Sequence, residues 1–247
     1  MHLDSSIIDF FTSCSLEELE NLQLLKRKDT KFLLPFHLLN PFLKDLSSDY
    51  KILESNGNRI FNYRNIYYDT PQRTMFLQHH NKKINRYKIR KRIYTDTATS
   101  WGEIKQKTKN NTTKKKRILL NSEKIFDEFI KTETPFSISD LSVSLENKFK
   151  RITLINSKIN EKITVDFDVE SFFKEKQIAW PFLGIIEVKS KNINQSLVFD
   201  LMKKYGIRAH TFSKYAVAML YLNNDLKYNN LKETLLLLNK IKQNNDT

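Results

Sequence analysis

The stretch RYKIRKRIY, residues 86–94, places five basic side chains within nine residues. In an extended strand, successive side chains point to opposite faces, so Arg86, Lys88, Arg90 and Arg92 share one face. Like charges this close together repel one another. Such a row is tolerated only if it meets a bound anion or open water. The stretch therefore predicts a β-strand with one cationic face, and the rest of the sequence must decide what that face meets.

The composition is that of a folded, strongly basic protein. The chain has 247 residues, of which 40% are hydrophobic, and a formal net charge of +14. This length and hydrophobic content predict a single domain over residues 1–247 with a substantial core. The excess of positive charge indicates an anionic partner, which could be a nucleic acid, a membrane surface or a phosphate-rich molecule. The alternative is a general solubility charge with no specific partner.

Cysteine usage and hydropathy bear on where the protein works. Cys14 is the only cysteine in the chain, so no intrachain disulfide can form and a reducing compartment fits. No run of apolar residues reaches the length of a transmembrane helix. The N-terminus lacks the basic and apolar regions of a signal peptide. We expect a cytoplasmic protein without a transmembrane segment.

Hydrophobic periodicity predicts strands interspersed with helices rather than strictly alternating with them. Strand patterns occur at 26–35, 50–55, 59–70, 83–94, 101–109, 114–120, 148–158, 161–171 and 183–191. Helical patterns occur at 15–25, 36–46, 70–80, 122–130, 137–149, 194–206, 212–222 and 230–243. Thr70 and Pro71 suit the start of the 70–80 helix. The order of elements predicts an α+β fold with a large antiparallel sheet.

Several other strands repeat the pattern of residues 86–94, with one charged and one apolar face. The charged faces carry Arg27, Asp29 and Lys31; Glu103, Lys105 and Lys107; Lys115 and Arg117; Lys150 or Arg151; Asp166 and Asp168; and Glu187 with Lys189. Lys214 adds a further basic residue. A sheet with one wet face would give this pattern on any single strand. Because many strands share it, we expect the sheet to close into a barrel with a common interior.

A cation-rich interior with a few carboxylates suits a polyanion together with a divalent metal. Lysine and arginine bind phosphate oxygens, and carboxylates bind hard cations such as Mg²⁺ or Mn²⁺. Other nucleotide and catalytic sites are excluded by what the sequence lacks. The chain has only four glycines, which argues against a P-loop or a Rossmann site. Neither a zinc-binding Cys/His spacing nor a Gly-x-Ser-x-Gly motif occurs.

The motifs resemble those of VTC domains, the catalytic domains of polyphosphate polymerases in the triphosphate tunnel superfamily. The resemblance covers residues 26–222 and rests on RKDTKFLLP, YYDTP, RYKIRKRIY, EIKQK, KKR, TVDFD, IIEVKSK and SKY in that order. It implies an antiparallel eight-stranded β-barrel with flanking helices. It also implies transfer of the γ-phosphate of ATP to a growing polyphosphate chain, assisted by Mn²⁺ or Mg²⁺.

The resemblance implies roles for individual residues. The expected catalytic cations are Arg90, Arg92, Lys105 and Arg151. The expected phosphate-binding residues are Arg27, Lys31, Lys88, Lys115, Arg117, Lys189 and Lys214. Glu187 matches the metal-binding glutamate, and Glu103 and Asp166 are the other candidate metal ligands. Where the superfamily's triphosphatases have a first-strand glutamate, Arg27 stands here, which favours the polymerase.

Two other functions remain open at this point. A tunnel triphosphatase would use the same barrel to hydrolyse tripolyphosphate or a nucleoside triphosphate. A barrel that only binds nucleic acid or polyphosphate belongs to another class. Nucleic acid is not expected, because the basic residues alternate with apolar ones, as in a barrel too narrow for a duplex. The expected partners are ATP and inorganic polyphosphate.

Overall fold

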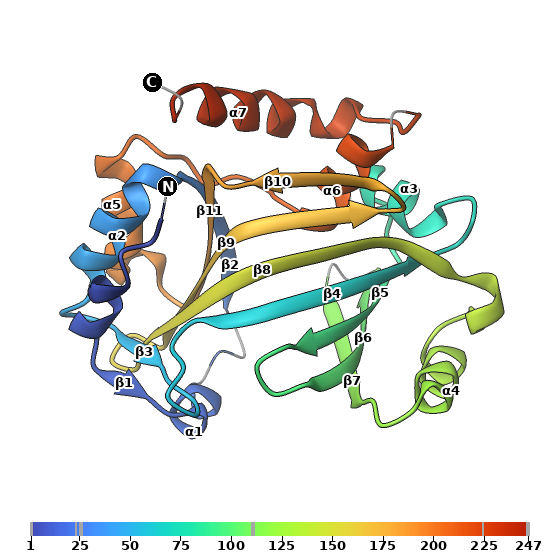
Figure 1. Ribbon diagram of the computed structural model, residues 1–247, viewed down its shortest axis with the longest axis horizontal. Helices are drawn as coiled ribbons and strands as arrows, with labels where there is room; N and C mark the ends of the chain where they lie inside the picture. The colour runs from blue at the N-terminus through green and yellow to red at the C-terminus, as the bar shows by residue number, and fades with distance from the viewer. Residues whose placement is uncertain (1, 23, 25–26, 110–111, 224, 246–247) are drawn as a thin grey trace.

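The computed structural model describes residues 2–22, 24, 27–109, 112–223 and 225–245. Its centre is an antiparallel sheet whose main path follows the order β2-β11-β9-β8-β4-β5-β6-β7 (Figure 1). These strands are β2 (Lys28–Pro35), β11 (Leu183–Ser190), β9 (Glu161–Phe173), β8 (Ser142–Asn156), β4 (Phe61–Asp69), β5 (Arg86–Tyr94), β6 (Thr99–Lys107) and β7 (Thr113–Leu119). The predicted α+β class and the antiparallel eight-strand arrangement are confirmed.

The sheet curls but does not close. In Figure 1 the long strands β8 and β4 cross the molecule, and β5, β6 and β7 turn away below them. Strands β2 and β7 stand at the two ends of the hydrogen-bonded path, and the described residues form no pairing between them. The expected closure of the sheet into a barrel is therefore wrong, because β2 and β7 are not joined by backbone hydrogen bonds between their described residues. The concave face is instead a deep channel with an open side.

Smaller elements extend this sheet at its margins. Strand β10 (Lys176–Trp180) pairs with β9, and β1 (Ser13–Cys14) pairs with β3 (Lys51–Leu53), which joins β8. Short 3₁₀ segments occur at Ser5–Phe10, Phe36–Leu38, Ile138–Asp140, Ile193–Gln195 and Asn229–Leu231. The α-helices are α1 (Leu16–Glu20), α2 (Leu39–Leu46), α3 (Thr74–His80), α4 (Glu123–Glu133), α5 (Leu197–Lys204), α6 (Lys214–Leu222) and α7 (Lys232–Gln243).

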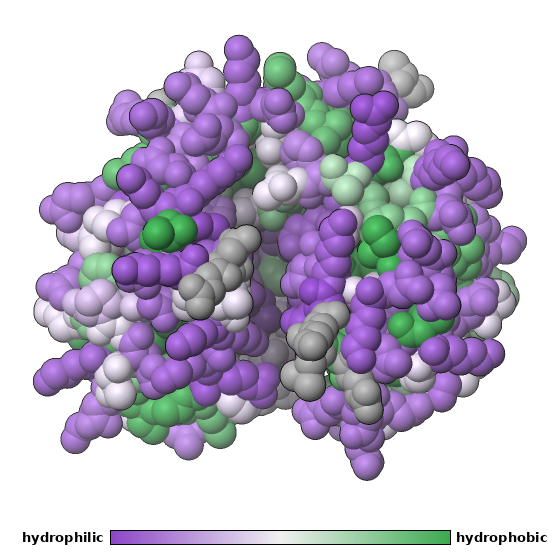
Figure 2. Space-filling model, turned by 180° about the vertical axis from the view of Figure 1, so that it is seen from behind, coloured by the Kyte–Doolittle hydropathy of each residue, from purple (hydrophilic) through white to green (hydrophobic). Residues whose placement is uncertain are grey.

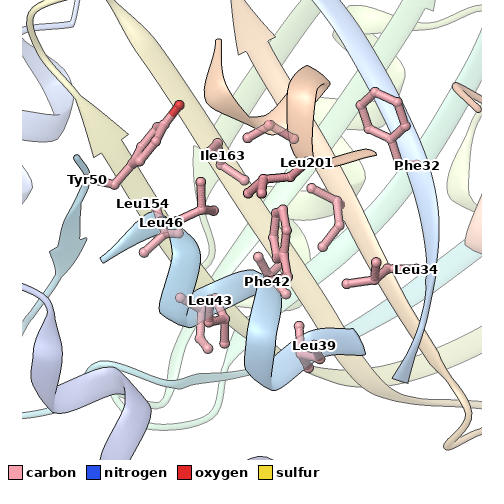
Figure 3. Packing of buried hydrophobic residues seen from close by; sticks show 14 of the residues in the cluster. Phe32, Leu34, Leu39, Phe42, Leu43, Leu46, Tyr50, Leu154, Ile163 and Leu201 are labelled. Atoms are coloured by element: carbon pink, nitrogen blue, oxygen red, sulfur yellow. The ribbon is translucent and has the colours of Figure 1, made fainter. Parts of the chain in front are cut away.

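Two helices cover the convex face of β2, β11, β9 and β8. Phe42 of α2 and Leu201 of α5 belong to one buried cluster with Phe32, Leu154 and Ile163 of the strands, and Figure 3 shows these side chains converging. The strand residues of this cluster alternate with the charged residues of the concave face. Burial of the apolar face therefore fixes which side chains point into the channel.

Helix α4 covers the convex face of the other wall. Phe126 and Phe129 pack with Ile89 of β5 and Ile104 of β6. Gly102 lies beneath this helix, where an added Cβ would stand 3.0 Å from the ring of Phe126. Because Gly102 and Ile104 face the helix, the intervening residues of β6 face the channel.

Helices α6 and α7 pack at one end of the channel. There the concave faces become apolar, and Leu33, Tyr67 and Ile185 form a buried cluster with residues of both helices, including Tyr215 and Ile241. Helix α7 runs along the outer edge of the molecule in Figure 1. Among the described residues, no helix is long and apolar enough to span a membrane.

Two predictions from local pattern were wrong. Residues 137–149 were expected to be helical, but β8 begins at Ser142 and continues through the strand predicted after it. Its pairing with both β4 and β9 outweighs the local helical preference. Helix α3 starts at Thr74, not at Thr70. The Thr70 hydroxyl instead accepts a hydrogen bond from the Thr74 amide at 3.0 Å.

The packing of Phe42 of α2 against the strands should contribute strongly to the stability of the protein. Phe42 is 0% exposed, so we expect Phe42→Ala to lower the free energy of unfolding by about 3–5 kcal/mol through lost burial and a residual cavity. Urea unfolding followed by circular dichroism measures this. Leu236→Ala, at a leucine that is 59% exposed on α7, is the control and should change it by less than about 0.5 kcal/mol. Equal losses of unfolding free energy in the two variants would show that Phe42 does not have this role.

Candidate functional site

The register of β5, β6 and β7 lines up the charged residues of three strands in rungs. Lys88 lies opposite Lys105, which lies opposite Lys115. Arg90 lies opposite Glu103 in the next rung. All of these side chains face the channel, as the sequence pattern predicted for residues 86–94. Figure 2 shows the molecule from behind, with a deep hollow between two lobes whose walls are mainly hydrophilic.

Glu103 organises the cations of this wall. Its carboxylate is 1% exposed and accepts hydrogen bonds from Arg90 Nε at 2.8 Å and Lys115 Nζ at 2.8 Å. Arg92 Nη1 lies 3.9 Å from Oε1. Burial alone would raise the pKa of Glu103, but the charges of Arg90, Arg92 and Lys115 hold it well below its usual range. Glu103 is therefore ionised at neutral pH.

A second carboxylate organises the opposite wall. Asp166 of β9 lies opposite Arg151 of β8, and Arg151 Nη2 donates to its Oδ2 at 2.8 Å. Lys214, the first residue of α6, donates to the same carboxylate. Burial opposes ionisation of Asp166, yet Arg151 and Lys214 lower its pKa. The helix that closes one end of the channel thus adds a lysine to this wall.

The third carboxylate, Glu187 of β11, is more accessible. Lys31 Nζ of β2 lies 2.9 Å from Glu187 Oε1, and Lys189 Nζ lies 3.2 Å from the same oxygen. The Glu187 side chain is 22% exposed, against 1% for Glu103 and 4% for Asp166. Although burial would raise its pKa, Lys31 and Lys189 hold the pKa well below its usual range.

Three lysines of the channel make no ion pair with a described carboxylate. Burial, reinforced by neighbouring cations, lowers the pKa of Lys88 and of Lys105 to about 7. The same causes lower the pKa of Lys162, on β9, to about 8. A bound polyanion would remove this cost by supplying negative charge next to the ammonium groups. These lysines therefore mark where the channel lacks anionic charge.

Sequence reasoning missed several residues of the channel. Lys162 shares the face of Asp166 on β9. Asn65 Oδ1 accepts from Arg92 Nε at 2.9 Å, and the Tyr67 hydroxyl accepts from Arg90 Nη1 at 3.1 Å. The period-two pattern of residues 61–69 places Asn65 and Tyr67 on one face, so it contained the signal. Neither residue is charged, and both orient the arginines through neutral acceptors.

Two of the expected phosphate-binding residues do not point into the central group, although Arg117 lies opposite Glu103 in the strand register. Arg27 is exposed and donates to Asp29 at 3.1 Å near the start of β2. Arg117 lies over the ring of Trp101, with its guanidinium carbon 3.9 Å from the ring centroid. The other expected site residues are brought together in the channel, namely Lys31, Lys88, Arg90, Arg92, Glu103, Lys105, Lys115, Arg151, Asp166, Glu187, Lys189 and Lys214.

The carboxylates do not form the expected three-residue metal group. Within the described part of the chain, no three acidic, histidine or cysteine side chains gather around a possible cation position. Glu103 and Asp166 already form ion pairs with buried arginine and lysine side chains. Magnesium is commonly held by one or two carboxylates plus substrate phosphates, and accessible Glu187 fits that arrangement. The channel thus suits a metal that arrives with its phosphate ligand.

The family model for the VTC domain matches residues 26–162 of the chain, which contain β2 to β8 and the first residues of β9. The chain belongs to the VTC domain family. The matched range includes the whole cationic wall of β5 to β7 and Arg151. No curated protein matches the VTC-domain chain significantly.

Solved structures resemble this VTC domain at low sequence identity. One is a protein from Hippeastrum described as a candidate adenylyl cyclase with a dominant triphosphatase activity, with a TM-score of 0.50, 13% identity, and coverage of 77% of this chain and 94% of that chain. Candidate adenylate cyclases from Vibrio parahaemolyticus (TM-score 0.49, 12% identity, coverage 81% and 99%) and Bacillus halodurans (0.49, 13%, 77% and 96%) are also similar. At these identities the likeness concerns the fold.

The lysine pKa values predict pH-dependent anion binding. Because Lys88 and Lys105 lose their charge as pH rises through about 7, affinity for inorganic tripolyphosphate should depend on their protonation and binding should take up protons. Isothermal titration calorimetry between about pH 6 and pH 8, in buffers of different ionisation enthalpy, measures the uptake.

The variant Lys88→Met/Lys105→Met should take up fewer protons and bind more weakly at pH 6. The ligand's own ionisation is common to all variants and cancels in the comparison. Lys150→Met is the control, because Lys150 lies on the convex side and pairs with Asp168 at 2.9 Å. Proton uptake that is the same in the double variant and in the control would contradict the prediction.

Proposed function

We propose that this VTC domain is a polyphosphate polymerase that transfers the γ-phosphate of ATP to the end of an inorganic polyphosphate chain. The observation that carries the proposal is the excess of cations in the channel. Lys88, Lys105 and Lys162 have no described carboxylate partner, and burial makes each of them costly without an anion. Membership of the VTC family supports this reading of the channel.

The reaction would need alignment and charge neutralisation rather than a strong base. A terminal phosphate oxygen of the acceptor chain is ionised near neutral pH and attacks the γ-phosphorus of ATP. A new phosphorus–oxygen bond forms while the bond to the β-phosphate bridging oxygen breaks, and ADP leaves with that electron pair. Arg90, Arg92 and Arg151 would neutralise the charge on the equatorial oxygens. Glu103, Asn65 and Tyr67 hold two of these guanidinium groups in place.

Mn²⁺ or Mg²⁺ would be held by Glu187 together with substrate phosphates. When bound, it would neutralise further negative charge on the phosphates. Lys31 and Lys189 would keep the Glu187 carboxylate ionised and oriented through its Oε1.

The rival functions differ in what they predict. A tunnel triphosphatase would use the same cations but deliver the phosphoryl group to water. A nucleic-acid-binding or polyphosphate-binding protein would bind without turnover. Nucleic-acid binding is disfavoured, because the cations of the candidate site lie on the concave face among buried carboxylates. A nucleic-acid-binding protein would present them on an exposed surface.

Incubation with γ-labelled ATP and Mn²⁺ tests the polymerase directly. We expect labelled chains that grow with time, resolved by gel electrophoresis. Arg90→Ala and Arg92→Ala should each lower the rate by about 100-fold, because each removes one positioned positive charge. Release of orthophosphate alone would assign the triphosphatase function instead.

A matched control separates the loss of this charge from the loss of the fold. The side chain of Lys150 lies outside the channel, although Lys150 is next to Arg151 in the sequence. Lys150→Ala should therefore leave the rate within about twofold of the wild type. All variants should keep the circular dichroism spectrum of the wild type. Full activity in both arginine variants would remove these residues from the site.

Glu187→Gln tests the metal position. The amide keeps the shape of the side chain but loses its charge, so a higher Mn²⁺ concentration should be needed for half-maximal activity, by about tenfold or more. Glu146→Gln is the control, since Glu146 pairs with Arg64 on the convex side at 2.8 Å. An unchanged metal titration in Glu187→Gln would place the metal elsewhere.

A further inference from the structure

We propose that the Trp101 end of the β6–β7 wall is a nucleobase subsite, which gives the channel a preference for nucleoside triphosphates over plain polyphosphate. The subsite consists of Trp101, Arg117 and Leu119. This inference rests on the proposed function for the identity of the donor. The chemistry of the subsite itself rests on the register and contacts of β5, β6 and β7 and on the packing of α4 against Gly102.

The channel wall changes in chemical character along these strands. The first rungs carry Lys88, Lys105 and Lys115, and then Arg90, Glu103 and Arg117, whose guanidinium turns toward the next rung. In the following rung, Trp101 stands opposite Arg92 on one side and Leu119 on the other. Lys105 lies four positions after Trp101 on β6, or about 13 Å along the strand. A ligand lying along the wall would thus meet cations first and an aromatic surface next.

Trp101 faces the channel for a steric reason. Its neighbour Gly102 is pressed against Phe126 of α4, so an added Cβ there would stand 3.0 Å from that ring. Alternation along β6 then points Trp101 to the concave face, where its side chain is only partly buried. In the part of the chain that the structure describes, Trp101 belongs to none of the buried hydrophobic clusters, and its large ring lies on a wet, charged face.

The contacts of Trp101 suit a flat, uncharged ring. The guanidinium of Arg117 lies 3.9 Å from the Trp101 ring centroid, and the Arg117 side chain is exposed. Leu119, directly across from Trp101, is 41% exposed. Nucleobases stack on aromatic rings and on arginine guanidinium planes. Inorganic polyphosphate has no group that would gain from this apolar surface.

The triphosphate of the same ligand would then lie over the cationic rungs. Arg92 stands between the two regions, beside Trp101 and 3.9 Å from the Glu103 carboxylate. The wall therefore orders the ligand, with the base over Trp101 and the phosphates over Arg90, Lys105 and Lys115. This order would direct the γ-phosphate away from the base subsite and toward the channel interior.

Binding of two probes tests the subsite without turnover. The probes are the β,γ-imido analogue of ATP and inorganic tripolyphosphate, both titrated by calorimetry without divalent metal. Trp101→Leu should weaken the ATP analogue by roughly tenfold, the scale of one base–aromatic stack. Tripolyphosphate affinity should stay within about twofold. Trp101→Phe should recover most of the lost affinity, because it keeps a stacking surface.

A second variant and a fluorescence measurement keep the test decisive if Trp101→Leu does not fold. Leu119→Asn changes an exposed residue on the edge strand and should also weaken the ATP analogue alone. The chain contains two tryptophans, and the other, Trp180, is buried against Phe212. In Trp180→Phe, the emission of Trp101 should respond to the ATP analogue and not to tripolyphosphate.

The outcomes separate this proposal from the proposed function. If Trp101→Leu weakens both probes equally, or neither, the base subsite is refuted. If the ATP analogue alone weakens while no polyphosphate is ever made, the subsite stands and the polymerase function fails. If polyphosphate is made at wild-type rates by a folded Trp101→Leu with unchanged ATP affinity, the polymerase stands and the subsite fails.

Discussion

The crowding of like charges on one concave surface is the constraint on which the rest of this structure depends. Each carboxylate of the channel lies among two or more cations and neutralises part of their charge. Glu103 lies among Arg90, Arg92 and Lys115, and Asp166 lies between Arg151 and Lys214. Such buried pairs add little stability by themselves. Their effect is to hold the arginines in fixed positions.

The convex face buries the apolar side chains that stabilise the charged part of the sheet. Helices α2 and α5 on one wall, and α4 on the other, cover the apolar sides of the strands. Because side chains alternate along a strand, each residue buried under these helices fixes a neighbour that points into the channel. Along the charged part of the channel, buried apolar side chains and charged side chains thus occupy opposite faces of the same strands, whereas at the α6 and α7 end the concave face is also apolar. This separation allows the channel to keep lysines such as Lys88 and Lys105, which lack a described carboxylate partner.

Some features of the site were readable from sequence and others were not. The alternation of RYKIRKRIY placed Lys88, Arg90 and Arg92 on one face, and the register confirmed it. The same alternation in β4 held Asn65 and Tyr67, but neutral residues carry no charge signal. The different roles of the three carboxylates depend on burial and on neighbours from other strands. Only the structure could separate accessible Glu187 from enclosed Glu103 and Asp166.

The sequence by itself determined the strands with two distinct faces, the antiparallel α+β class and most of the residues that line the channel, because strand periodicity is a local property. Tertiary structure decided three other features. Pairing on both sides made residues 142–149 a strand despite their helical pattern. The ends of the sheet, β2 and β7, curl toward a shared channel, and their described residues do not pair with each other. Packing of α4 on Gly102 fixes Trp101 toward the channel. Each depends on contacts between segments far apart in the chain, which local sequence does not encode.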